Sequence, residues 1–421
     1  METLRSIYHW LFAALGNIVF GFPSRRLYVV GVTGTKGKSS TVELMSALFD
    51  AAGERTAVLS SVTRKIGANR ARNMSGNSMP GRFAIQQFLS EAVRAKCTYA
   101  FVEVTSQGVL QHRHEFIDWN AAVFLNLSPE HIEAHGSFEE YKQAKLAFFR
   151  YVAASPKKDR VFLVNEDDAV SSEFEEAVHH NYGNAVLKFS GKKFLRETLG
   201  AHFDLRTEKA RAELGEWLLA EFNLENAAAA TRLAEARGVE WKYIEKGLVG
   251  FKGVPGRFEI VQKKPFVVVV DYAHTPDSLR KVYATLRNDY CMGPDAGRLI
   301  CVLGSAGGGR DKWKRSEMGR VAAKYCSEIV LTDEDSYDEN LADIMKAIKG
   351  GILEDNFPIT KIHEVPDRRE AIRKAISLAE KSDAVVMTGK GSETSIHLAH
   401  GKKIPWNERE IALEILKERR T

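Results

Sequence analysis

The sequence is poor in the features that mark extracellular proteins. It has four cysteines in 421 residues, and no two of them form a CxxC pair. We therefore expect no disulfide framework, and we interpret Cys291, Cys301 and Cys326, which lie in or near apolar runs, as buried thiols. This usage fits a reducing compartment, so the sequence predicts a cytoplasmic protein.

A long apolar run is also lacking. The segment IYHWLFAALGNIVFGF is short for a membrane span, and His9, Asn17 and two glycines interrupt it. It carries no small-residue cleavage site of the kind that ends a signal peptide. We expect residues 1–25 to form an amphipathic helix packed on the body of the protein. Peripheral contact with a membrane or another protein is the alternative role.

Charge of one sign does not dominate any part of the chain. The net charge is +5, from 60 basic and 55 acidic residues that are interspersed. This pattern argues against a nucleic-acid partner. With 44% hydrophobic residues, the chain is long enough for two or three domains with cores.

Short β-branched runs recur along the chain, and helical patterns separate many of them. The runs are LYVVGVT, YAFVEVT, AAVFLNL, RVFLVN, PFVVVVDYA, RLICVLG, EIVLTDE and DAVVMTG. Such alternation predicts an α/β fold with parallel sheets covered on both faces. Residues 187–215 are less regular, and we expect a β-rich excursion there. A helical pattern followed by GVPGR predicts a domain boundary near residue 252.

The stretch GVTGTKGKSS, residues 31–40, lies between an expected strand and an expected helix. Free N–H groups and the positive end of that helix would face an anion. In a phosphate-binding loop Lys38 would reach the β- and γ-phosphates, and Ser39 would ligate Mg²⁺. Val32 occupies the first glycine position of GxxxxGK[ST], so an ordinary glycine-rich turn is the alternative. No NKxD signature stands out, which favours ATP over GTP.

Acidic and histidine residues follow in the segments VEVTSQGVLQHR and SPEHIEAHGSFEEYKQAK. Glu103 ends an expected strand, where its carboxylate could reach a metal near the loop. His131 and His135 are spaced i, i+4 and would share one face of a helix. The segment lacks the HExxH order, so a zinc hydrolase is disfavoured. A structural role for one histidine is the simpler interpretation.

From about residue 26 onward the motifs resemble the Mur ligase family in sequence and order, most closely its MurE type. The blocks that carry the resemblance are GVTGTKGKSS, EVTSQGVLQHR, FLNLSPEHIEAHGSFEEYKQAK, EFNLENAAAA, GVPGRFE, VDYAHTPDSL, GGGRDKWKR and TGKGSE. The resemblance implies a ligase that uses ATP and Mg²⁺ to activate a carboxylate as an acyl phosphate. An amino acid then attacks, on a muramyl-peptide acceptor of peptidoglycan synthesis.

The resemblance also implies the domains. Residues 1–25 would be an N-terminal helical segment, residues 26–251 the central P-loop ATP-binding domain, and residues 252–421 a C-terminal Rossmann-like α/β domain. A hinge near residue 252 would let the C-terminal domain close over the nucleotide.

By resemblance, four residues carry the catalysis: Lys38, Glu103, His131 and Lys145. Ser39, Glu103, His131 and Lys145 would serve the metal ions, and Lys145 matches the lysine that the family carbamylates. The carbamate would turn a cation into an anion that supports Mg²⁺. The residues implied for ATP are Gly34, Thr35, Lys36, Gly37, Lys38, Ser39, Ser40, Asn126, Asn223, Asn226, Arg257, Asp271 and His274.

The resemblance places two substrates on different parts of the chain. Asn77, Ser78, Ser106 and Arg113 match residues that face the acceptor. The residues matched to the incoming amino acid are Arg310, Asp311, Arg315, Asp335, Gly389 and Glu393.

The sequence departs from the family pattern at several points. Typical members carry a further, UDP-gripping domain before the P-loop, whereas only 26 residues precede the first expected strand here. Gln107 replaces a histidine, and Glu130 and Glu133 replace aspartates. Residues 334–337, EDSY, stand where diaminopimelate-adding members have Asp-Asn-Pro-Arg. Because the arginine is missing and Asp335 adds negative charge, we expect lysine or another basic amino acid over diaminopimelate.

Two other functions are compatible with these motifs. Folylpolyglutamate synthases share the core and also lack the UDP-gripping domain, so a non-UDP acceptor is one alternative. A nucleotide-binding subunit without ligase activity is the other. The joint presence of Lys38, Glu103, His131 and Lys145 argues against the second.

Overall fold

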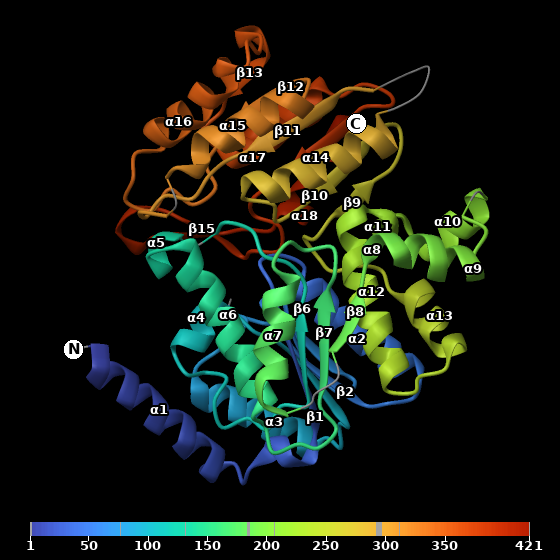
Figure 1. Cartoon of the computed structure of the whole chain (residues 1–421). Coiled ribbons are helices and arrows are strands. Elements are labelled where there is room, and N and C mark those ends of the chain that lie inside the picture. Colours follow the sequence, from blue (N-terminus) through green and yellow to red (C-terminus); the bar gives the residue numbers. More distant parts are fainter. Residues whose placement is uncertain are drawn as a thin grey trace. The chain divides into compact units, whose positions relative to one another are not determined.

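The structure of the protein is a computed structural model that describes residues 2–75, 77–130, 132–182, 186–205, 207–291, 297–310 and 312–420. His131 and Asp311 of the expected site therefore lie outside the described residues. The chain divides into two compact units, residues 1–252 and residues 253–421 (Figure 1).

The first unit is built on an eight-stranded sheet in the order β4-β3-β2-β5-β1-β6-β7-β8. The six strands from β2 to β8 in that order run parallel, and the β3 and β4 edge is antiparallel. The strands are β1 (Tyr28–Thr33), β2 (Thr56–Leu59), β3 (Thr63–Ile66), β4 (Asn69–Arg72), β5 (Tyr99–Glu103), β6 (Ala121–Phe124), β7 (Val161–Asn165) and β8 (Val186–Phe189).

Helices cover both faces of this sheet (Figure 1). Before β7 they are α1 (Glu2–Val19), η1 (Pro23–Arg26), α2 (Lys38–Ala51), α3 (Arg82–Arg94), α4 (Ser106–Leu110), α5 (Ile132–His135) and α6 (Phe138–Ala153). After β7 they are α7 (Ser171–Tyr182), α8 (Gly191–Lys193), η2 (Phe194–Leu199), α9 (Gly200–His202), α10 (Glu208–Leu214), α11 (Glu216–Leu219), α12 (Glu221–Ala236) and α13 (Trp241–Gly250).

The core of the first unit lies between the sheet and helices α3, α6 and α7. It is rich in aromatic side chains that are fully buried, among them Phe88, Trp119, Phe124, Phe148 and Phe174. Strand β1 approaches α6 so closely that a Cβ atom at Gly31 would collide with Phe148. The glycine at this position is therefore required by packing, and it fixes β1, which leads into the phosphate loop, against α6.

The second unit has a six-stranded sheet in the order β13-β12-β11-β14-β10-β9, parallel except for β9, and a separate β15-β16 pair. The strands are β9 (Glu259–Gln262), β10 (Val267–Val270), β11 (Leu299–Leu303), β12 (Glu328–Leu331), β13 (Ile362–Glu364), β14 (Ala384–Met387), β15 (Ser395–His397) and β16 (Lys403–Pro405). The helices are α14 (Pro276–Tyr290), α15 (Lys314–Tyr325), α16 (Leu341–Glu354), η3 (Ile359–Lys361), α17 (Arg368–Leu378), η4 (Ala399–Gly401) and α18 (Glu408–Arg420).

These two parallel sheets confirm the α/β prediction, and each of the eight β-branched runs contains a strand. The expectation of a β-rich excursion at residues 187–215 is wrong. Strand β8 ends at Phe189, and short helices follow. The side chains of Ser190 and Thr207 accept hydrogen bonds from the N–H groups of Lys193 and Ala210, so each hydroxyl caps a new helix start.

The interpretation of the cysteines as thiols is wrong for two of them. Cys301 and Cys326 form a disulfide, with their Cα atoms 6.1 Å apart. Cys301 lies in β11, and Cys326 lies two residues before the neighbouring parallel strand β12, so strand pairing brings them together. Cys97 and Cys291 are free and buried.

Helix α1 packs along α3. The ring of Phe20 meets that of Phe83 at 5.0 Å, and Gly16 leaves room for the same ring. The opposite side of α1 exposes large apolar side chains, namely Tyr8, Leu11, Phe12, Leu15, Ile18 and Val19. Within the part of the chain that the structure describes, neither this helix nor any other has the length and apolarity to cross a membrane.

Candidate active site

The phosphate loop connects β1 to α2, and polar contacts from other elements hold its backbone. Gly37 has a φ of 86° and precedes the helix start at Lys38. A Cβ atom at Gly37 would collide with the amide of Asn226, so only glycine fits. Asn126 clamps the loop: its main-chain oxygen accepts from Thr35 N at 2.9 Å, and its side-chain oxygen accepts from Lys36 N at 2.9 Å.

Two lysine ammonium groups meet at this loop. Lys38 Nζ donates to the main-chain oxygens of Gly34 at 2.9 Å and Thr35 at 2.8 Å. Lys145 Nζ, from α6, donates to the same Gly34 oxygen at 2.8 Å and lies 4.6 Å from the centre of the Tyr141 ring. Lys145 is 1% exposed, and burial together with the charge of Lys38 holds its pKa well below the ordinary value.

A carboxylate lies beside the first turn of α2. Ser39 Oγ donates to Glu103 Oε2 at 2.8 Å, and Ser61 N donates to the same oxygen at 3.0 Å. Hydroxyl and carboxylate oxygens are hard donors, and Mg²⁺ is usually held by one or two carboxylates together with phosphate oxygens. Ser39 and Glu103 therefore fit a Mg²⁺ ion that accompanies a triphosphate. The structure shows no cluster of three or more His, Cys, Asp or Glu side chains able to hold a metal, as far as its described residues extend.

The segment that follows β6 closes the other side of the loop. Glu130 Oε1 accepts from Lys36 Nζ at 2.8 Å, and the hydroxyls of Thr35 and Tyr141 are 3.1 Å apart. His135 Nε2 lies 3.0 Å from Ser106 Oγ, at the start of α4. Ser106, an expected acceptor residue, is thus joined to the histidine segment through His135.

The two asparagines expected near the adenine are tied into the helices. Thr41 Oγ1 donates to Asn226 Oδ1 at 3.1 Å, Asn226 Nδ2 donates to Asn223 Oδ1 at 3.1 Å, and Asn223 Nδ2 donates to the Trp217 oxygen at 2.7 Å. Both asparagines are 3% exposed. This chain links α12 to α2 and so fixes the loop; adenine contact remains a prediction.

The expected acceptor residues come from two segments that the fold brings together. Arg113 donates to the main-chain oxygen of Met79 and, at 2.6 Å, to Gln111 Oε1. Met79 belongs to the stretch that starts at Asn77, and its neighbour Ser78 is buried. Arg113 therefore anchors the Asn77–Ser78 stretch next to α4.

In the second unit, Asp271 organises the turn after β10. Its carboxylate accepts from Phe258 N at 2.6 Å and from Ala273 N at 2.7 Å. The guanidinium of Arg257 lies 4.1 Å from the Tyr272 ring centre, and His274 Nδ1 is 2.7 Å from the main-chain oxygen of Tyr272. Arg257, Asp271 and His274, which the sequence predicted at the nucleotide, are thus neighbours at one sheet edge.

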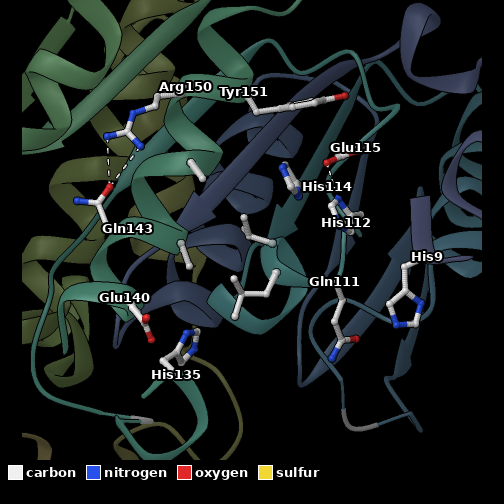
Figure 2. A pocket seen from close by; sticks show the side chains of 14 residues that line it. His9, Gln111, His112, His114, Glu115, His135, Glu140, Gln143, Arg150 and Tyr151 are labelled. Carbon is white, nitrogen blue, oxygen red and sulfur yellow. Dashed lines mark hydrogen bonds and ion pairs between the residues drawn. The ribbon is translucent and has the colours of Figure 1, made fainter. Parts of the chain in front are cut away.

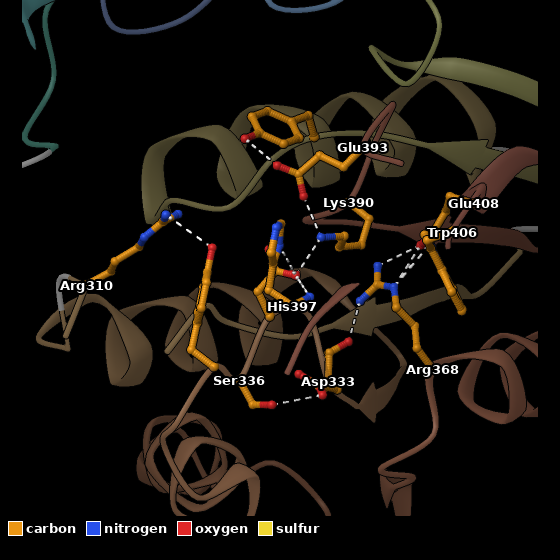
Figure 3. Close-up of polar contacts among 12 residues, drawn as sticks. Arg310, Asp333, Ser336, Arg368, Lys390, Glu393, His397, Trp406 and Glu408 are labelled. Atoms are coloured by element: carbon orange, nitrogen blue, oxygen red, sulfur yellow. Dashed lines mark hydrogen bonds and ion pairs between the residues drawn. The ribbon is translucent and has the colours of Figure 1, made fainter. Parts of the chain in front are cut away.

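Two of the expected amino-acid residues, Asp335 and Glu393, belong to an ionic cluster around the buried Lys390 (Figure 3). Lys390 Nζ donates to Asp335 Oδ1 at 2.9 Å and to Glu393 Oε2 at 2.5 Å, and Tyr272 OH donates to Glu393 Oε1 at 3.1 Å. Asp335 also accepts from His397 N at 2.7 Å. Asp335 therefore lies in an ion pair with Lys390, and the same ammonium group is shared with Glu393.

A positive charge lies close to the position where the family arginine is missing. Arg310 donates to Tyr337 OH at 3.2 Å, its guanidinium is 5.3 Å from the centre of that ring, and it is exposed. Arg315, by contrast, is buried and bound to Glu339 at 3.1 Å. Gly389 has a φ of 100°, and a Cβ atom there would collide with the carboxylate of Glu334.

Glu334 is a buried acid whose state depends on pH. Burial raises its pKa from 4.5 to about 7, and its Oε2 atom has no hydrogen-bond partner among the described residues. Because the pKa of Glu334 is raised in the folded state, the protonated side chain makes its full contribution to stability below the pKa of the unfolded state. That contribution is lost as the pH rises through about 7. We expect Glu334→Gln to raise the free energy of unfolding by up to about 3 kcal/mol at pH 8 and by little near pH 4.5. Urea unfolding at the two pH values tests this, and an equal effect at both would contradict it.

Several residues of the site were not predicted from the sequence. Ser61 binds the same carboxylate as Ser39, but a serine after a strand carries no signal of its own. Lys390 lies between two glycines in the TGKGSE motif, which was the one signal available. Glu130 was recognised only as a departure from the family pattern, although it pairs with Lys36.

Comparisons with known proteins agree with this arrangement. Residues 32–234 match the Mur ligase middle domain, and residues 256–391 match the Mur ligase glutamate ligase domain. The UDP-N-acetylmuramoyl-L-alanyl-D-glutamate–2,6-diaminopimelate ligase of Halalkalibacterium halodurans is 33% identical over 414 residues, which cover 97% of this chain and 82% of that protein. The UDP-N-acetylmuramyl-tripeptide synthetase of Deinococcus radiodurans is 33% identical over 406 residues, or 95% and 80%.

Solved structures of known proteins share the fold of this chain. A UDP-N-acetylmuramoyl-L-alanyl-D-glutamate–2,6-diaminopimelate ligase superposes with a TM-score of 0.61 at 25% identity and covers 98% of this chain and 83% of its own. The Mycobacterium tuberculosis folylpolyglutamate synthase complexed with ADP and AMPPCP shares the fold at a TM-score of 0.65 and 17% identity, over 92% and 96%. From its phosphate loop to its TGKGSE motif, the chain belongs to the Mur ligase family, and the relatives named above are of its MurE type.

Proposed function

We propose that this protein is an ATP-dependent ligase that adds an amino acid to the carboxylate of a muramyl-peptide acceptor. The observation that carries the proposal is the convergence of Lys38, Lys145, Ser39 and Glu103 on one phosphate loop. A generic P-loop protein needs the loop lysine, the serine and an acid for the triphosphate and its Mg²⁺. The buried Lys145 is the additional group, and it supports the further step of acyl transfer.

The reaction requires groups that bind and neutralise the negative charge of the triphosphate. The loop N–H groups and Lys38 bind the β- and γ-phosphates, and the negative charge that develops as the γ-phosphoryl group moves is stabilised there. Mg²⁺ held by Ser39 and Glu103 would supply further neutralisation of the triphosphate. The acceptor carboxylate takes the phosphoryl group, the amine attacks the acyl phosphate, and phosphate leaves with formation of the amide bond.

The test of this function is the substrate dependence of phosphate release. Purified protein with ATP and Mg²⁺ should release phosphate only when UDP-muramyl-dipeptide and an amino acid are both present. Release with the acceptor alone or without it would identify an ATPase instead. No release with any amino acid would contradict a muramyl-peptide ligase.

A folate-type acceptor is the second candidate, because folylpolyglutamate synthases share the fold over 96% of their own chain. Replacing the muramyl peptide by a folate with glutamate as the added amino acid distinguishes the two. A nucleotide-binding subunit without activity remains disfavoured, since Lys38, Glu103 and Lys145 are all present and lie together. We place the reaction in the cytoplasm, where ATP is available.

For the incoming amino acid we propose one with a distal carboxylate, such as diaminopimelate. Tyr337 stands in the place of the family arginine. The exposed guanidinium of Arg310 lies over the Tyr337 ring, so Arg310 supplies the positive charge for a distal carboxylate from another loop. Arg310→Ala is expected to raise the KM for diaminopimelate at least about tenfold and to leave the KM for lysine within about twofold. Steady-state kinetics with both amino acids measures this. A preference for lysine in the unmodified protein would contradict the proposal.

A further inference from the structure

Helix α1 of the first unit turns its small and polar residues toward the rest of the protein. Ala13 and Gly16 are buried, and Gly16 lies against Phe83 of α3. His9, on the same side of the helix, lines a hollow together with Gln111 (Figure 2). The contact of α1 with the protein therefore leaves the larger apolar side chains of the helix to its other side.

The outer side of α1 is a continuous apolar face. Its side chains stand at positions 8, 11, 12, 15, 18 and 19, which is the i, i+3, i+4 spacing of a single helix face. Their exposed fractions run from 40% for Phe12 to 62% for Ile18. Single exposed apolar side chains are ordinary, but a contiguous patch of large ones marks a contact surface.

Two aromatic residues give the first half of this face an amphipathic character. The Trp10 ring meets the ring of Phe116 at 5.1 Å, and the residue is nevertheless 45% exposed. Tyr8 is 53% exposed, with its ring 4.4 Å from that of Phe12. Rings that combine an apolar body with a polar N–H or O–H group favour the boundary between hydrocarbon and water.

Positive charge stands at the end of the apolar face. Arg25 and Arg26 of η1, which follows α1, are both exposed. The Arg25 guanidinium lies 4.3 Å from the centre of the Phe22 ring, so its charge is next to the last aromatic ring of the apolar segment. Asp118 pairs with Arg25 at 3.3 Å, and Lys157 adds a further cation where it donates to the Arg25 main-chain oxygen at 3.1 Å. The cations outnumber the carboxylate at this end of the face.

The charges decide what kind of partner fits the face. Residues 3–26 include Arg5, Arg25 and Arg26 and no acid. A lipid surface with anionic headgroups matches this combination, because apolar side chains enter the boundary of the acyl chains while arginines meet the headgroups. A second copy of this chain would bring the same cations and no counter-charge on its own α1.

We propose that α1 docks this protein on a membrane surface that contains anionic lipids. The helix lies in the plane of the interface, with its small-residue side on α3 and its large apolar side in the headgroup and acyl boundary. This inference goes beyond the proposed function, because it concerns the place where the protein works and not the reaction.

Co-sedimentation with vesicles of phosphatidylcholine containing about one third phosphatidylglycerol tests the apolar part of the contact. The unmodified protein is expected to bind these vesicles. Leu15→Asp puts a charge in the middle of the face and should lower the partition coefficient at least about tenfold. Leu413→Asp is the matched control, since Leu413 is an exposed leucine of α18, outside α1, and its binding should stay within about twofold.

The charged part of the contact is tested with Arg26→Ala. This variant should bind the vesicles that contain phosphatidylglycerol about fivefold more weakly, with no change on vesicles of phosphatidylcholine alone. Raising the salt concentration should weaken binding of the unmodified protein to the anionic vesicles for the same reason. An equal effect of Arg26→Ala on both kinds of vesicle would contradict a role of anionic headgroups.

Further measurements separate the proposal from its alternatives. Leu15 is 49% exposed, so the midpoint of thermal unfolding of Leu15→Asp should stay within a few degrees of the unmodified protein. Equal vesicle binding by the two proteins, or no binding by the unmodified protein, would overturn membrane docking. A dimer in sedimentation velocity that Leu15→Asp dissociates, without vesicle binding, would identify a second copy as the partner instead. Phosphate release is measured without vesicles, so failure of the docking and failure of the proposed function are distinguishable.

Discussion

Replacing Lys38 with alanine is expected to lower phosphate release by about 10³-fold or more, with the fold unchanged. Lys38 is the first residue of α2, and its ammonium group turns back onto the Gly34 and Thr35 oxygens. A phosphate group at the loop would take this ammonium as its partner. Because the developing charge on the γ-phosphoryl group is stabilised by this fixed cation, its loss affects the transition state directly.

The measurement for Lys38→Ala is single-turnover phosphate release with all substrates present, and the midpoint of thermal unfolding checks the fold. The side chain is partly exposed and two of its partners are main-chain oxygens of the same loop, so we expect a shift of only a few degrees. Lys142→Ala is a suitable control, since that lysine of α6 pairs with Glu139 and with Glu173 of α7. Turnover within tenfold of the unmodified protein would show that the loop does not handle the phosphates.

Lys145→Ala is the second substitution with a large expected effect, again about 10²–10³-fold on turnover. The side chain is buried beside the loop, and its pKa is held low by burial and by the charge of Lys38. A neutral amine can react with CO₂, which forms an N–C bond and releases a proton to give a carbamate. That anion would support Mg²⁺, whereas an ammonium group would repel it.

Bicarbonate separates the carbamate from a plain structural role of Lys145. The unmodified protein should lose activity in CO₂-depleted buffer and regain it when bicarbonate is added, and ¹³C-labelled bicarbonate should give a carbamate signal in the NMR spectrum. Lys145→Ala should remain inactive with bicarbonate, because the nitrogen that forms the carbamate is gone. Normal turnover of Lys145→Ala would refute the carbamate hypothesis.

The strands and the phosphate loop could be predicted because local sequence determines them. Val29, Val30 and Val32 form a β-branched run that is fully buried, and glycines follow directly where the chain turns into α2. The periodic apolar residues of α2, such as Val42 and Leu48, are buried as their spacing indicates. Residues 187–215 were misjudged because short helices with capping hydroxyls leave little periodicity in the sequence.

The site was harder to predict where it depends on pairing between distant segments. The sequence shows Asp335 as one more acid, and only the fold reveals that Lys390 lies 2.9 Å from it. The disulfide has the same cause, since Cys301 and Cys326 meet through the pairing of β11 and β12.

The most direct test of the account uses an acceptor labelled with ¹⁸O in its reacting carboxylate. If this protein activates that carboxylate as an acyl phosphate, mass spectrometry should find one ¹⁸O atom in each phosphate released, and the amide product should keep the other. Released phosphate without ¹⁸O, or label found in AMP instead, would contradict transfer of the γ-phosphoryl group to the carboxylate.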